Sequence, residues 1–182
     1  ALRGQLAKFL DADSADDISL LRNTSEALNI IATGLSWSPG DEVIFPANEF
    51  PSNLLPWAAL EAQGVVVKAV TLSKTQPEQD IIAQITPKTR LVSVSAVQFD
   101  TGVRLDLDAI GQAAHHAGAL FCVDAIQMLG ALPLSVRHLP VDFVVSGSHK
   151  WLMAPEGMGF MWSRRGVRER MKVALPGWRM YD

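Results

Sequence analysis

Residues 141–162, VDFVVSGSHKWLMAPEGMGFMW, consist of two apolar runs joined by a polar turn that carries one lysine, Lys150. Short apolar runs bounded by turn residues indicate buried strands. A lysine between two such strands has two interpretations. It can extend its ammonium group from a strand end into water. Alternatively, a partly desolvated lysine amine can form a Schiff base with an aldehyde.

The rest of the chain alternates between apolar runs and segments with helical spacing. Strands are expected at 17–21, 41–45, 65–70, 90–97, 119–125, 141–147 and 157–162. Helices are expected over 2–10, 23–37, 52–64, 77–85 and 106–118, with Asn23 or Thr24 and Asp106 as caps and a break near Pro56. Strands separated by helices predict an α/β fold, a three-layer α/β/α domain with a mainly parallel sheet.

Composition narrows the class of protein. The 182 residues are 48% hydrophobic and 19% charged, so the chain can bury a sizeable core. A net charge of -3 without a Lys/Arg cluster argues against a nucleic-acid partner, and every apolar run is too short to span a membrane. Cys122 is the single cysteine, and the first residues do not resemble a signal peptide. We therefore expect a cytoplasmic protein with no membrane partner and no bound metal.

Polar residues follow several of the predicted strands, and in open α/β sheets ligands bind beyond the carboxyl ends of the strands. These residues are Thr24, Ser25, Asn48, Glu49, Gln98, Asp124, Gln127 and the segment 146–150, and the aromatic Phe50 lies among them.

Pyridoxal 5′-phosphate (PLP) is a cofactor that this set could hold. It needs a Schiff-base lysine, a carboxylate at its pyridine nitrogen and a helix N-terminus for its phosphate. Lys150, Asp124 and the segment NTSEALN at 23–29 meet these needs, and Phe50 could cover the ring. Each also has a simpler interpretation, since Asp124 and residues 23–25 can cap helices and Phe50 can pack in the core.

Four segments in this order resemble the class V aminotransferase family of PLP enzymes. They are NTSEALN (23–29), NEFPSNLLPW (48–57), VDAIQMLG (123–130) and SGSHKWLMAPEGMGF (146–160). The family includes aminotransferases, cysteine desulfurases, kynureninase and isopenicillin N epimerase-like proteins. The resemblance covers residues 17–178 and implies PLP as cofactor and the large domain of a fold type I enzyme. Its most specific part is Asp124 followed 26 residues later by Lys150.

The resemblance implies a role for each matching residue. Lys150 is expected to form the internal aldimine and to move protons at the substrate carbon, while Asp124 holds the protonated ring nitrogen. Contacts to the phosphate are expected from Thr24, Ser25 and His149, with Ser146 or Ser148 as an open choice. Contacts beside the ring are expected from Phe50, by stacking, and from Gln98 and Gln127 near the ring hydroxyl. Gln98 could otherwise be a turn residue with an exposed amide.

Phe50 departs from the cysteine desulfurase pattern, in which a histidine stacks on the ring and can transfer protons. Phenylalanine stacks but cannot move a proton, which favours other branches of the family. Transamination of an amino acid is therefore the first expectation. The alternatives are a PLP-dependent lyase of the desulfurase or kynureninase type, an epimerase, and a non-catalytic PLP-binding or scaffold module.

Members of the family are longer than this chain. Residues 1–182 are therefore expected to be the PLP-binding large domain, a fragment without an N-terminal segment and a small C-terminal domain. The resemblance further implies a homodimer, with the loop at 176–182 near its interface.

Overall fold

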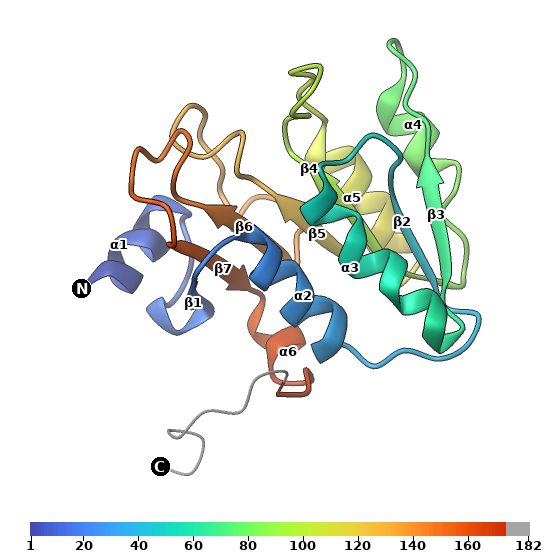
Figure 1. The fold of residues 1–182 in the computed structure, drawn as a ribbon, viewed down its shortest axis with the longest axis horizontal. Coiled ribbons are helices and arrows are strands. Elements are labelled where there is room, and N and C mark those ends of the chain that lie inside the picture. Colours follow the sequence, from blue (N-terminus) through green and yellow to red (C-terminus); the bar gives the residue numbers. More distant parts are fainter. Residues whose placement is uncertain (174–182) are drawn as a thin grey trace.

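The computed structural model describes residues 1–173, which form a seven-stranded sheet with helices on both faces (Figure 1). The strands are β1 (Ile18–Leu21), β2 (Glu42–Pro46), β3 (Val66–Val70), β4 (Thr89–Ser95), β5 (Leu120–Asp124), β6 (Phe143–Gly147) and β7 (Gly159–Ser163). The helices are α1 (Leu2–Phe9), α2 (Thr24–Gly34), α3 (Leu55–Ala58), α4 (Pro77–Ile82), α5 (Leu107–His116) and α6 (Arg165–Arg168). Three 3₁₀ helices cover Ala15–Asp17, Pro51–Asn53 and Ala59–Gln63.

The strands lie in the order β1-β7-β6-β5-β4-β2-β3. Neighbouring strands from β6 to β3 pair in parallel, whereas β7 is antiparallel to both β6 and β1. The prediction of a mainly parallel sheet is confirmed. The direction of β7 follows from its short connection to β6, which contains no helix, because a parallel pairing requires a longer crossover.

Side chains alternate between the two faces of the sheet, so each face has its own core. In β5, Phe121 and Val123 pack with α1, α4 and α5, whereas Cys122 packs with α2 and the segment around Trp57. Figure 1 shows α2 and α3 in front of the sheet and α5 behind it. The predicted three-layer α/β/α architecture is confirmed.

The predicted helix starts are present. Asn23 caps α2, because its side-chain oxygen accepts a hydrogen bond from the backbone N–H of Glu26 at 2.8 Å. The carboxylate of Glu26 in turn accepts the backbone N–H of Arg22 at 2.7 Å. Asp106 caps α5 by accepting bonds from two backbone N–H groups of its first turn.

The helix predicted over 52–64 is wrong in its detail. This segment forms a 3₁₀ helix, the short α3 and a second 3₁₀ helix that ends at Gly64. Pro56 lies in the first turn of α3, where its missing N–H costs no hydrogen bond, so a new helix begins there instead of one continuing through.

The topology of the sheet indicates where a ligand site should lie, at the edge formed by the carboxyl ends of the parallel strands. Strands β2, β4, β5 and β6 all run toward this edge, which their carboxyl ends form. The chain passes from β3 across β2 to β4, so the strand order changes direction between β2 and β4. Ligands in open α/β sheets bind beside such a switch point. In residues 1–173, the structure contains no helix long and apolar enough to cross a membrane.

Candidate active site

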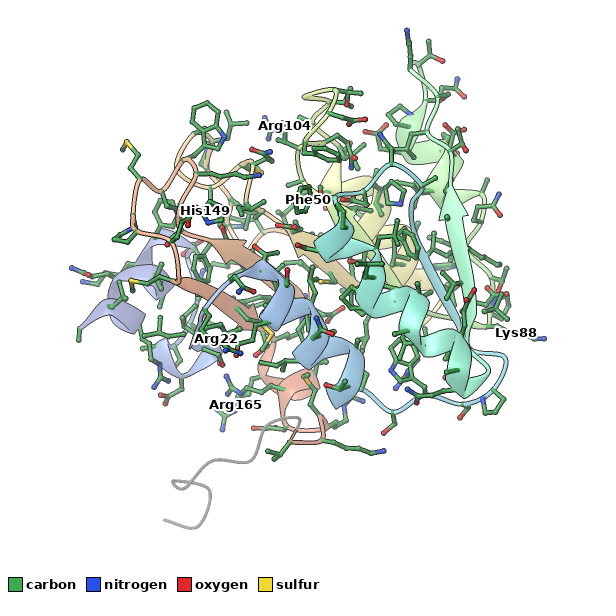
Figure 2. All side chains as sticks on the ribbon, viewed as in Figure 1. Arg22, Phe50, Lys88, Arg104, His149 and Arg165 are labelled. Atoms are coloured by element: carbon green, nitrogen blue, oxygen red, sulfur yellow. The ribbon has the colours of Figure 1, made fainter. Side chains whose placement is uncertain are left out.

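A pocket of about 130 Å³ lies at this edge, between the carboxyl ends of β4, β5 and β6 and the N-terminus of α2. It is lined by Asn23, Thr24, Ser25, Phe50, Ser52, Ser95, Phe99, Asp124, Ile126, Gln127, His149 and Lys150. Seven of the ten residues predicted from the sequence are therefore brought together. Figure 2 shows Phe50 and His149 on the same side of the molecule, far from Lys88 and Arg165.

Three larger hollows, of about 500, 490 and 290 Å³, lie beside α5. Size alone would favour them as ligand sites. Their linings contain neither Lys150 nor Asp124, and they lie away from the switch point of the sheet. We therefore assign the site to the smaller pocket, which combines a nucleophilic amine, a buried acid and a helix N-terminus.

The N-terminus of α2 supplies the anion-binding wall of the pocket. Thr24 is buried, and its hydroxyl oxygen has no hydrogen-bond partner. The hydroxyl of Ser25 lies 2.7 Å from that of Ser52. Free N–H groups and hydroxyls at a helix start form a binding site for phosphate, because the helix dipole favours negative charge there.

Asp124 ends β5 and is buried at the base of the pocket. The pKa of its carboxyl group is raised to about 7, mainly by burial and also by the negative charge of Glu49. A hydrogen bond of 3.0 Å from the backbone N–H of Ile126 and the charge of Lys150 act in the opposite direction. Near neutral pH the group is therefore only partly ionised, and a cation placed against it would favour the ionised form.

Lys150 and Phe50 face each other across the pocket. The Nζ atom of Lys150 lies 5.7 Å from the centroid of the Phe50 ring, within the range of a cation–π interaction. Phe99 meets the same ring edge-on, with centroids 5.4 Å apart and planes at 82°. Phe50 is 46% exposed, so the core interpretation of this residue is wrong.

Gln98, Ser146 and Ser148 are buried near the pocket but do not line it. The hydroxyl of Ser146 donates to the carbonyl of Gly147, and that of Ser148 to the carbonyls of Pro155 and Met158. These two serines therefore organise the loop around Lys150. Their role as phosphate contacts stays a prediction.

Gln98 is 2% exposed, so its interpretation as an exposed turn residue is wrong. Its amide nitrogen donates to Glu49 at 3.2 Å, and its amide oxygen is buried without a partner. From the sequence, Glu49 was assigned no role beyond a place among the strand-end residues. A carboxylate inside the NEFPSN turn, directly after the apolar β2, is the signal that could have singled it out.

The residues present fit PLP on structural grounds. The orphaned hydroxyl of Thr24 at a helix start suits its phosphate, and the orphaned amide oxygen of Gln98 suits a polar group beside the ring. Asp124 and Lys150 bring an acid and an amine to the same pocket. Among residues 1–173, no cluster of three or more His, Cys, Asp or Glu side chains could hold a metal ion. The loop at 176–182, predicted near a dimer interface, lies outside the described residues.

Comparison with known proteins decides the family. The family model for class V aminotransferases matches residues 1–182. The chain belongs to this family. The predicted family and fold are thereby confirmed.

Similar class V proteins include several named as cysteine desulfurases. A probable cysteine desulfurase of Methanothermobacter thermautotrophicus is 38% identical over 96% of this chain and 44% of its own length. One from Synechocystis is 35% identical over 99% of this chain and 44% of its own length. The chain thus spans less than half the length of these curated relatives.

Solved structures of the family agree with the fold. The Escherichia coli cysteine desulfurase CsdA superposes with a TM-score of 0.92 at 30% identity, over 98% of this chain and 46% of CsdA. The cystine C–S lyase C-DES, bound to its product cysteine persulfide, superposes with a TM-score of 0.91 at 27% identity, over 98% of this chain and 49% of the lyase. A C-DES variant carries glycine covalently linked to PLP.

Proposed function

We propose that residues 1–182 are the PLP-binding part of a lyase that cleaves the carbon–sulfur bond of cysteine or a related amino acid. The observation that carries this proposal is the single pocket that joins Lys150, Asp124 and the N-terminus of α2. The names of the similar proteins support the choice of reaction, because they describe two cysteine desulfurases, one of them probable, and a cystine C–S lyase. Transamination, the first expectation from the sequence, is not the activity that these names give.

The cofactor, when bound, withdraws electrons from the substrate carbon and so makes its bonds easier to break. Asp124, buried at the base of the pocket, holds the proton on the ring nitrogen. The N-terminus of α2 and the hydroxyls of Thr24 and Ser25 bind the phosphate. Lys150 provides the amine that joins the aldehyde and afterwards moves a proton at the substrate carbon.

Phe50 excludes water from one face of the cofactor ring, and its orientation is stabilised by the edge-to-face contact with Phe99. It cannot give or accept a proton, so it leaves the departing sulfur without an acid or base at this position. Cys122 does not fill this gap, since it is buried inside β5 and burial raises the pKa of its thiol.

The wider setting of the chain follows from the same proposal. The chain is the large domain of a longer, cytoplasmic enzyme that works as a homodimer, and its substrate is a small amino acid. The greater length rests on three curated relatives, of which the chain covers 44–45%. The cytoplasmic setting and the homodimer are carried forward as expectations from the sequence.

Cofactor capture by Lys150 is the first test. The purified chain is mixed with PLP, its absorption is recorded, and borohydride is added to fix any Schiff base before peptide mapping. The label should lie on Lys150 and be lost in Lys150→Ala, while the exposed Lys88→Ala serves as the matched control. Equal labelling of the parent and Lys150→Ala would refute the assignment. The loaded protein is then given cysteine with a reductant: release of sulfide supports the lyase, and conversion of an amino donor to a keto acid supports transamination instead.

A further inference from the structure

Glu49 is a buried acidic residue, 5% exposed, that has no part in the chemistry above. Its Oε1 atom accepts hydrogen bonds from the backbone N–H of Ser95 at 2.6 Å and from the amide of Gln98 at 3.2 Å. Its Oε2 atom accepts one from the hydroxyl of Ser95 at 2.5 Å. Three donors thus converge on one carboxyl group away from water, and such bonds favour its ionised form.

Glu49 lies close to the acid of the site. Ser95 and Asp124 are direct partners on the parallel strands β4 and β5, which are about 4.8 Å apart. Partners in register point their side chains to the same face of the sheet. Because Glu49 is bonded to both the backbone and the hydroxyl of Ser95, its carboxyl group reaches the immediate surroundings of Asp124.

The other titratable groups around the two acids act in a defined direction. Lys150 lowers the pKa of Asp124, whereas Glu49 raises it. The pKa of Glu49 is itself raised, because burial outweighs the hydrogen bonds from Ser95 and Gln98 that lower it. Cys122 lies in the same interior, but burial raises the pKa of its thiol and keeps it uncharged. Two buried carboxyl groups as close as Glu49 and Asp124 repel each other when both are ionised, which costs free energy. The pair therefore retains a proton.

We infer that Glu49 is a positioning residue of the cofactor site, which is held by Ser95 and Gln98 and keeps a proton on Asp124 for the ring nitrogen. This inference rests on the proposed function, in which Asp124 faces that nitrogen. Asp124 would hold the pyridine nitrogen of PLP. With a neutral nitrogen, its carboxyl group would supply the proton, so that a carboxylate would pair with a pyridinium without a proton from solvent.

Carboxyl NMR of the cofactor-free chain tests the coupling directly. The ¹³C signal of Asp124, assigned by its loss in Asp124→Asn, should titrate near pH 7 in the parent. Glu49→Gln keeps the shape of the side chain, and its amide can accept from the N–H of Ser95 and donate to the hydroxyl. The midpoint should fall by about one to two units in this variant. The exposed Glu61→Gln is the matched control and should leave the midpoint unchanged.

An unchanged midpoint in Glu49→Gln would overturn the inference and leave Glu49 a purely structural residue. If that variant does not fold, the parent alone decides the matter. Coupled acids titrate together, so the Glu49 and Asp124 signals should each show two steps. Two independent single-step curves would overturn the inference.

Calorimetry of PLP binding measures how many protons the protein takes up when the cofactor binds. Binding is measured at pH 6.5 in buffers of different ionisation enthalpy, which gives the number of protons taken up. The parent should take up few, and Glu49→Gln should take up roughly 0.6 more per PLP bound, because its Asp124 is already ionised. Equal uptake by parent and variant would contradict the inference. Absence of PLP binding by the parent would instead defeat the proposed function, while the NMR result on the two acids would still stand.

Discussion

Gly130 fixes the loop that carries Lys150, and its replacement by alanine should damage both the fold and the site. Its φ is +99°, and a Cβ atom there would overlap the carbonyl of Trp151 and lie 2.9 Å from the backbone nitrogen of Leu152. Gly157, in the same loop, has φ of +83° but open space around its Cβ position. The two glycines therefore share the backbone conformation and differ in crowding.

This difference gives the expected magnitudes. Gly157→Ala should cost about 1–2 kcal/mol, the strain of a left-handed alanine. Gly130→Ala carries the same strain and must also push away the Trp151 backbone, which adds about 1–3 kcal/mol by analogy with overpacked cores. The sum is a large part of the stability of an ordinary domain, about 5–15 kcal/mol.

Urea unfolding measures the stability of both variants. With a slope of about 2 kcal/mol per molar urea, the midpoint of Gly130→Ala should lie about 0.5–1.5 M below that of Gly157→Ala. Because the displaced peptide directly follows Lys150, borohydride labelling of this lysine with PLP should also fall in Gly130→Ala and stay near the parent value in Gly157→Ala. Equal midpoints and equal labelling in the two variants would refute the role of this contact.

Two further predictions concern buried polar groups. Because the pKa of Asp124 is about 7 in the folded chain against 3.8 as its ordinary value, the folded state holds the extra proton, and stability should fall as pH rises between these values. Asp124→Asn should thus stabilise the cofactor-free chain by on the order of 4 kcal/mol at pH 8 and by little near pH 4. Urea unfolding at the two pH values measures this difference, and equal effects at both would contradict the prediction. Asn53, fully buried, accepts hydrogen bonds from Trp57 at 3.0 Å and Ser93 at 2.6 Å. Asn53→Ala should cost about 2–4 kcal/mol by leaving both donors unpaired, and a thermal-unfolding loss below about 1 kcal/mol would refute that.

Much of the fold follows from local sequence signals. The caps Asn23 and Asp106 mark helix starts that the structure contains, because a side chain that accepts a backbone N–H acts over only a few residues. The direction of β7 and the splitting of the helix around Pro56 depend on connection length and on short-range geometry, which apolar periodicity does not carry.

The site residues that could be predicted are those whose side-chain chemistry fits the cofactor and whose place in the sequence is the end of a predicted strand. Lys150 and Asp124 follow apolar strands whose carboxyl ends meet at one edge, so topology alone brings them together. Glu49 and Gln98 are different, because their structural role depends on burial and on the hydrogen bond between them, and the two residues are 49 positions apart in the sequence. Ser146 and Ser148 have the composition of a phosphate-binding turn, yet their hydroxyls bond to nearby carbonyls, a competition that the sequence does not reveal.

The insertion of β7 between β1 and β6 has a consequence for the order of events during synthesis. The edge strand β1 emerges from the ribosome early, but its partner residues 159–162 follow roughly 140 residues later, which takes about 7–28 s at ordinary elongation rates. Until then, the turn with Lys150 is held at the end of β6 and packs against Gly130, but β7 does not yet hold its other end. A nascent chain stopped before residue 159 would display the lysine without the closed hairpin that holds it, so cofactor capture is coupled to completion of the sheet.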